Sequence, residues 1–283
     1  MSRWATSGRH PKGDRVSLSL LSQAFLADGD VFEAPTVEHS FFFDRIGDGT
    51  VIASVKAMVL LVLGTLLVIG FFIAASRKTA MLPGKLQYAG EAIYGFVRNG
   101  VAIEILGKHG KPWAGFLTSL FVFILIQNLW GIVPLAQLPV TSHFAIPVLL
   151  AGMVWVLYMG VGIRKHGFFG FFKLMCYIPG IPPAMHIMLI PIEFLSNIIL
   201  RPFTLAIRLF ANMFAGHMLI TIAAVGTLYL WGTGTPVNYV LGLLPFIGSL
   251  GLVFFELLIC SLQAYVFVLL TAIYLESSLA DSH

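Results

Sequence analysis

The sequence predicts an all-α, polytopic membrane protein with about five membrane helices. Of its 283 residues, 58% are hydrophobic and only 11% are charged, and the mean hydropathy is +0.91. This composition lies outside the range of soluble globular domains. Residues 57–76 carry no charge and can cross about 30 Å of hydrocarbon as one helix, and residues 112–163 contain no Asp, Glu, Lys or Arg. The net charge of +4 therefore indicates topology rather than nucleic-acid binding.

Apolar runs and charged loops divide the chain into a tail and a membrane domain. Residues 1–50 begin with four basic residues and a polar-diluted apolar stretch, which favours an external tail over a cleaved signal peptide. Residues 51–283 are the membrane domain. In order, we expect a first span at 52–75, an amphipathic interfacial helix at 86–106, spans at 113–133 and 145–163, and a long hairpin at 186–275 as the functional core.

The last two apolar segments are too long for vertical spans. A helix over 186–230 would measure about 68 Å, more than twice the hydrocarbon thickness. We therefore expect either a break near Pro191 or Pro202 or a strongly inclined helix. The short sequence WGTGTP joins this segment to 237–275, which indicates an antiparallel hairpin.

Basic residues cluster in alternate loops. Lysines and arginines follow the first span, precede the second and follow the third, whereas the loops around 135–143 and 232–236 have none. By the positive-inside rule, the basic loops are cytoplasmic and the neutral loops are external. This orientation places the N-terminus outside and the C-terminus inside.

Arg208 is the residue that most needs an explanation. A charge at the centre of a membrane helix costs about 2.5–3.5 kcal/mol, and an arginine stays protonated there. Small residues nearby, such as Ala211 and Ala215, would let another helix approach closely. No carboxylate lies within one turn, so we expect the counter-charge to come from another polypeptide.

Further polar side chains follow the same line of the helix. If the helix is continuous, these residues lie within roughly 60° of Arg208. This polar stripe consists of Glu193, Asn197, Arg201, Thr204, Arg208 and Asn212. Such a stripe needs water or a polar partner along its length, and the alternative is that its Asn and Thr side chains only hold helices together.

His217 faces the opposite side of that helix, about 180° from Arg208. Glu256, Gln263 and Ser249 share one face of the last helix, and the hairpin brings His217 close to Glu256. A buried histidine and carboxylate suit a proton relay, because both can change protonation near neutral pH. A static buried ion pair is the alternative reading.

No cofactor motif is present. Cys176 and Cys260 lie in separate apolar segments and are interpreted as buried thiols. We expect no cofactor, no metal site, no catalytic residue and no nucleic-acid partner. Two other functions compete with an ion channel subunit: a secondary transporter or channel whose arginine binds an anionic substrate, and a purely structural membrane subunit. The chain shows no repeat of the Arg208 motif, which disfavours the transporter.

The sequence RPFTLAIRLFANMFAGH at 201–217 strongly resembles the signature of subunit a of the F-type ATP synthase. LQAYVF at 262–267 is similar to the last helix of that family. The resemblance implies a stator channel of the membrane sector beside a ring of c subunits, with b subunits of the peripheral stalk and other synthase subunits as partners. It also implies proton transport coupled to ATP synthesis in a bacterial plasma membrane, with H⁺ favoured over Na⁺.

The resemblance also implies roles for single residues. The essential arginine of the family corresponds to Arg208, its asparagine to Asn212 and its glutamine to Gln263. Some members carry Glu then His where this chain has His217 and Glu256, so the acid–base pair is exchanged in position. Glu193 lies one residue out of register with the carboxylate of the family. We expect four residues to line the half-channels: Glu193, Asn197, Thr204 and Ser249.

Overall fold

The structure is a computed structural model that describes residues 49–77, 84–133, 139–171, 183–232 and 236–280. All secondary structure in these residues is helical. The elements are α3 (Gly49–Ser76), α4 (Lys85–Val97), π-helix η1 (Arg98–Ile103), α5 (Glu104–Leu106), 3-10 helix η2 (Gly107–His109), α6 (Gly110–Leu129), 3-10 helix η3 (Val140–Ser142), α7 (Ala145–His166), α9 (Pro183–Leu195), π-helix η4 (Ser196–Leu200), α10 (Arg201–Gly232) and α11 (Pro236–Leu279). The predicted tail up to residue 48 and Cys176 lie outside the described residues.

Five helical stretches in the described part of the chain are long and apolar enough to cross a membrane. They are Ala57–Ser76, Lys85–Leu129, Ala145–His166, Met188–Gly232 and Pro236–Leu279. The predicted all-α polytopic fold with about five membrane helices is therefore confirmed.

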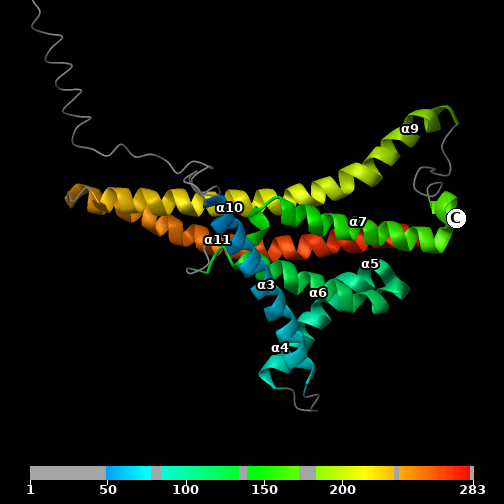
Figure 1. The fold of residues 1–283 in the computed structure, drawn as a ribbon, viewed down its shortest axis with the longest axis horizontal. Coiled ribbons are helices and arrows are strands. Elements are labelled where there is room, and N and C mark those ends of the chain that lie inside the picture. Colours follow the sequence, from blue (N-terminus) through cyan, green and yellow to red (C-terminus); the bar gives the residue numbers. More distant parts are fainter. Residues whose placement is uncertain (1–48, 78–83, 134–138, 172–182, 233–235, 281–283) are drawn as a thin grey trace, which may run out of the picture.

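Helices α10 and α11 form the predicted long antiparallel hairpin. They lie side by side along the longest axis of the molecule, and α7 runs beside them (Figure 1). Near the turn, Trp231 Nε1 donates to the carbonyl of Tyr239 at 3.3 Å. A Cβ at Gly242 would lie 2.5 Å from this indole nitrogen, so only a glycine leaves room for the tryptophan.

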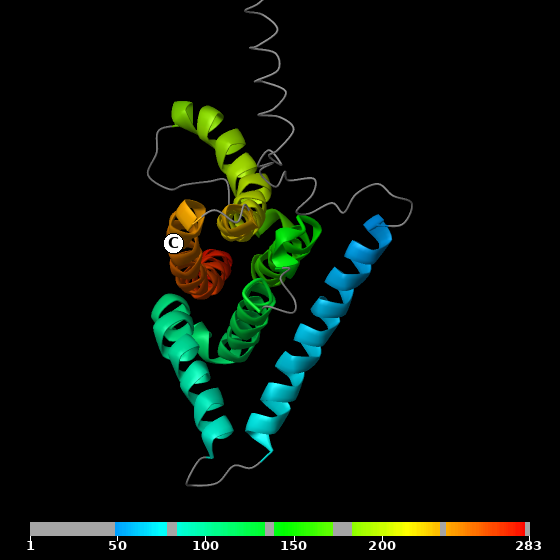
Figure 2. The ribbon, with the colours of Figure 1, turned by 90° about the vertical axis from the view of Figure 1, so that its left-hand side faces the viewer.

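Helix α3 crosses this hairpin steeply. Figure 2 looks along the long axis, so that α10 and α11 appear end-on while α3, in blue, extends across the view. Figure 1 shows the same crossing from the side. The hairpin is therefore strongly inclined relative to the first span, which explains how two helices of this length fit one membrane.

The long segment stays one helical stretch, but it departs from regular α-helix near the prolines where one alternative placed a break. The irregular part is π-helix η4, which lies between Pro191 and Pro202. Proline has no backbone N–H, so both residues weaken the hydrogen-bond ladder around this segment. Helix α9 bends away from the axis of α10 on the far side of η4 (Figure 1).

The segment predicted as an interfacial helix at 86–106 comprises α4, η1 and α5. The chain reverses at Gly107, whose φ of 54° suits glycine. A Cβ at Gly110 would lie 2.1 Å from the carbonyl oxygen of Ala102, so the two arms of this turn touch. Helix α6 then packs back along η1 and α4, with Val97 and Val101 fully buried. Its position at the membrane interface stays a prediction.

Candidate functional site

The candidate site lies along the seam between α10 and α11. The seam forms because α10 carries Leu205, Leu209 and Met213 four residues apart, which places them on one face. All three are buried, and Met213 contacts Cys260 of α11 with a sulfur–sulfur distance of 3.9 Å. The apolar seam fixes how each helix is rotated, and therefore where the polar side chains point.

Arg208 is exposed on the surface of α10 that no other part of the described chain covers. Within the described residues it makes no hydrogen bond and no ion pair. Ile207, Ala211 and Ala215 are exposed on the same side. The prediction that the counter-charge belongs to another polypeptide agrees with this position.

Asn212 and Gln263 join the two helices by a hydrogen bond. Asn212 Nδ2 donates to Gln263 Oε1 at 2.7 Å. Gln263 is only 2% exposed, whereas Asn212 lies at the exposed edge of the hairpin, one turn from Arg208. The structure therefore brings these two predicted residues together and links them to the Arg208 surface.

Glu256 is buried in the same seam, with an exposed fraction of 2%. Neither of its carboxyl oxygens has a hydrogen-bond partner among the described residues. Its carboxyl carbon lies 3.3 Å from the place where a Cβ on Gly216 would stand. His217 follows Gly216 directly and is half-buried. The proximity of the histidine and the carboxylate stays a prediction.

The polar stripe does not continue unchanged through η4. A π-helix changes the rotation of the residues before it relative to those after it, and Asn197 is buried at 4% exposure while Arg208 is exposed. Tyr158 of α7 donates to the carbonyl of Asn197 at 2.6 Å, and Asn197 Nδ2 donates to Glu193 Oε2 at 3.1 Å. The expectation of one continuous face is wrong here, because it assumed regular α-helix throughout.

Arg201 is held by α11. One of its guanidinium nitrogens donates to the hydroxyl of Ser277 at 3.2 Å, and its charge lies 5.2 Å from the centre of the Tyr274 ring. Cation–π contacts of this kind are favourable at such distances. Unlike Arg208, this arginine therefore has its partners within the chain.

Thr204 and Ser249 use their hydroxyl groups locally. Thr204 donates to the carbonyl of Leu200 at 2.7 Å, and Ser249 donates to that of Phe246 at 2.7 Å. Hydroxyl groups in membrane helices commonly donate a hydrogen bond to a backbone carbonyl of the same helix in this way. Their predicted role in lining a half-channel stays a prediction.

Two further residues matter in the seam region: Tyr158, which the sequence reasoning missed, and Gly216, which it named only as one of the small residues that let another helix approach. Gly216 matters because it leaves room for a carboxyl group on the other helix, and Tyr158 matters because it contacts the π-helix. Small residues near Arg208 pointed to Gly216 in general terms. No local pattern identifies the partner of Tyr158, since it lies 39 residues away in the chain.

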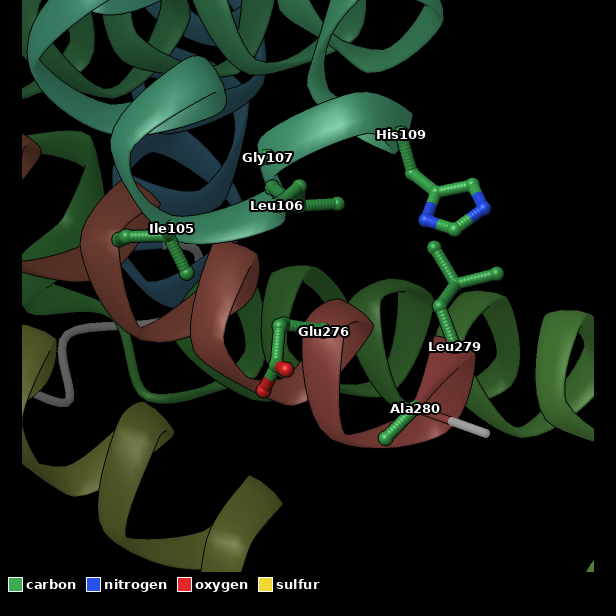
Figure 3. A pocket seen from close by; sticks show the side chains of 7 residues that line it. All are labelled: Ile105, Leu106, Gly107, His109, Glu276, Leu279 and Ala280. Atoms are coloured by element: carbon green, nitrogen blue, oxygen red, sulfur yellow. The ribbon is translucent and has the colours of Figure 1, made fainter. Parts of the chain in front are cut away.

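A pocket of about 300 Å³ lies elsewhere, between the turn after α5 and the end of α11. His109 points toward Leu279, whereas the carboxyl group of Glu276 points away from the imidazole (Figure 3). None of the residues that line the pocket belongs to the polar seam. The pocket is therefore separate both from the exposed surface that carries Arg208 and from the seam that buries Glu256.

Comparisons with known proteins agree with the geometry. The family model described as ATP synthase A chain matches residues 57–276. The chain is similar to ATP synthase subunit a of a Nocardioides species, with 42% identity over 91% of this chain and 96% of that protein. It is 41% identical to ATP synthase subunit a of Streptomyces lividans, over 97% of this chain and 100% of that protein. A match of this extent, on a fold with the long helix pair, shows that the chain belongs to the ATP synthase A chain family.

Proposed function

We propose that this chain is the stator channel of the membrane sector of a bacterial ATP synthase, and that it conducts protons through two offset half-channels. The protons reach and leave carboxyl groups on a rotating ring of c subunits beside Arg208. Proton flow is thereby coupled to rotation and to ATP synthesis, while the chain itself carries no catalytic residue. The observation that carries this proposal is the exposed arginine, which has no partner among the described residues.

The exposed charge of Arg208 acts on the ring. A neutral carboxyl group can move through lipid, whereas its charged form can do so only at high cost. When a ring carboxyl returns to the stator, the guanidinium favours its ionised form and the proton leaves toward the cytoplasm. The same positive charge opposes direct passage of a proton between the half-channels, so transport requires rotation.

The seam residues receive protons from the outside. Glu256 is buried without a hydrogen-bond partner among the described residues, and such a group requires water or a mobile proton beside it. His217 lies beside Gly216, which contacts the carboxyl group, and together these groups can exchange a proton. The bond from Asn212 to Gln263 leads from this seam to the edge that carries Arg208.

Glu193 and Asn197 belong to the cytoplasmic half-channel. Glu193 is half-buried and bonded to Asn197 on the far side of Arg208 from Glu256, so it suits an exit path for released protons. The ends of α7 and α11 meet at that side, since Lys165 Nζ donates to the carbonyl of Leu279 at 2.5 Å. The last turn of α7 carries Arg164 and Lys165, and α11 ends just before the C-terminus. The positive-inside rule places both of these ends in the cytoplasm.

The test uses inverted membrane vesicles that contain the whole synthase. Wild-type vesicles should acidify when ATP is added, with H⁺ rather than Na⁺ as the transported ion, so acidification should not depend on sodium. Arg208→Ala should abolish acidification while the other subunits remain assembled. If Arg208→Ala vesicles acidify as wild-type vesicles do, the channel role is refuted and the structural-subunit alternative is favoured.

A further inference from the structure

A second group of buried polar side chains lies outside the seam, where the end of α6 and η3 meet α3. We call it the η3 cluster, and it consists of Gln127, Asn128, Trp130, Thr141, Ser142 and His143. Thr141 Oγ1 donates to Asn128 Oδ1 at 2.7 Å, and Gln127 Nε2 donates to a backbone carbonyl of α3 at 3.1 Å. A Cβ on Gly64 of α3 would lie within 2.9 Å of the side-chain nitrogens of both Gln127 and Trp130, so these two side chains meet at Gly64.

Several atoms of the η3 cluster are buried without a hydrogen-bond partner among the described residues. They are Gln127 Oε1, Asn128 Nδ2, Trp130 Nε1 and His143 Nε2. An unpaired buried polar atom destabilises a protein, and apolar side chains would fill the same space without that cost. The presence of four such unpaired atoms in two short segments is explained if water molecules occupy the cluster.

The η3 cluster lies beside the functional seam. Helix η3 packs against α10. Phe144, which follows His143, contacts Phe210 edge-to-face with ring centres 5.4 Å apart, and Phe210 stacks on Phe214 at the same distance. Phe214 lies one turn from His217 on α10. The cluster therefore adjoins the face of α10 that carries Phe210 and Phe214, within one turn of His217.

We propose that His143 receives protons from the external solution and passes them through the η3 cluster to Glu256 and the Asn212–Gln263 pair. This inference rests on the proposed function and names the entry residue of its external half-channel. The imidazole is half-buried, and its Nε2 is buried without a hydrogen-bond partner among the described residues. It lies in the loop between α6 and α7, which the absence of basic residues places outside.

The proton transfer needs no other reactant. A lone pair on an imidazole nitrogen takes a proton from hydronium, so that one N–H bond forms and a neutral water molecule remains. The imidazolium then gives a proton to a water oxygen or polar group in the cluster, and the neutral ring is restored. The net result is the movement of one proton inward.

The charges around His143 are compatible with this step. Burial lowers the pKa of His143 from its ordinary value of 6.5, so the ring is neutral at pH 7 and can accept a proton. Residues 57–76 and 112–163 contain no Asp, Glu, Lys or Arg. The charged or titratable residues of α3, α6 and α7, which pack against η3, are Lys56 of α3, Lys111 at the start of α6, and Tyr158, Arg164, Lys165 and His166 of α7. The titratable or charged side chains of α10, which also packs against η3, are those of Arg201, Arg208, His217 and Tyr229, and none of them hydrogen-bonds to Nε2 of His143.

The test uses intact synthase in proteoliposomes, with the ATP-forming head outward so that the lumen corresponds to the external side. Initial ATP synthesis is measured over a series of lumen pH values, at one outer pH and one potassium–valinomycin potential. His143→Gln should lower the rate at least about threefold at a lumen pH near 7, because proton capture then limits transport. The rate should approach wild type at a lumen pH near 5, where hydronium is abundant.

His166 provides a matched control at the opposite end of α7. Its Nε2 is also buried without a partner among the described residues, but the positive-inside rule places it on the cytoplasmic side. His166→Gln should keep the wild-type dependence on lumen pH. The proposal is overturned if His143→Gln follows the wild-type curve, or if both substitutions change it equally.

A second measurement does not require the histidine. His143→Cys, with Cys176→Ser and Cys260→Ser, should react with a membrane-impermeant thiosulfonate added from the external side, and the label should slow ATP synthesis. Labelling only from the cytoplasmic side would overturn the proposal. The proposed function fails separately, through pumping by Arg208→Ala, so the two failures can be distinguished.

Discussion

Gly216 offers a sharp test of the contact between α10 and the buried carboxyl group. A Cβ at this position would lie 3.3 Å from the carboxyl carbon of Glu256, 3.4 Å from Oε1 and 3.5 Å from its Cγ. These separations are tight, so Gly216→Ala forces the carboxyl group to move by a few tenths of an ångström. Overpacking of a tight site destabilises it by about 1–3 kcal/mol. Because the Glu256 side chain can shift, we expect a destabilisation at the lower end of this range.

A cost of about 1 kcal/mol in the transfer step corresponds to roughly fivefold slower proton transport. We therefore expect Gly216→Ala to reduce initial ATP-driven acidification of inverted vesicles about fivefold. Gly216→Val adds two methyl groups against the same atoms and should abolish acidification. Immunoblots of the purified complex would check that each variant is assembled.

Gly226 is the matched control, because it lies in the same helix and a Cβ there would meet no atom within 4 Å. Gly226→Ala should pump like wild type. The reasoning is refuted if Gly216→Ala also pumps like wild type. It is equally refuted if both alanines slow pumping to the same extent, since the effect would then come from the helix and not from Glu256.

Two further contacts give predictions of their own. A double-mutant cycle with Asn212→Ala and Gln263→Ala should give a coupling of about 0.6–1.7 kcal/mol in thermal or denaturant stability of the complex, and a value near zero would contradict the 2.7 Å bond. Tyr158→Phe removes the donor to the carbonyl of Asn197 and should destabilise the complex by about 1 kcal/mol, measured by its thermal midpoint. An unchanged midpoint would show that this hydrogen bond contributes nothing.

Much of the fold could be predicted because a chain in the hydrocarbon of a membrane can adopt only a few backbone conformations. An uncharged stretch such as 57–76 has to be a helix in lipid, since its backbone groups find no other partners there. Two apolar segments of more than forty residues joined by WGTGTP have to form an inclined hairpin, since vertical spans would be too long. Helical rotation alone then separates Arg208 from His217.

The rest of the site depends on packing between helices. π-Helix η4 changes the rotation of Asn197 relative to Arg208 about the helix axis. Its sequence, SNIIL, contains no residue from which a π-helix could be predicted. The partners of Tyr158 and Arg201 lie far away in the chain, so helical periodicity does not identify them. The η3 cluster was also hidden, because its polar residues are scattered among apolar ones.

The central claim is that the partner of Arg208 is a moving carboxyl group on a neighbouring subunit. The most direct measurement is a disulfide crosslink from Ala215→Cys, which is exposed two turns from Arg208, to a cysteine placed beside the carboxyl group of the c subunit. We predict a crosslink on oxidation that stops ATP-driven rotation and pumping, whereas Ala206→Cys, which is buried at 3% exposure, should give none. Absence of the Ala215 crosslink in an assembled complex, or equal crosslinking from Ala206→Cys, would contradict the account.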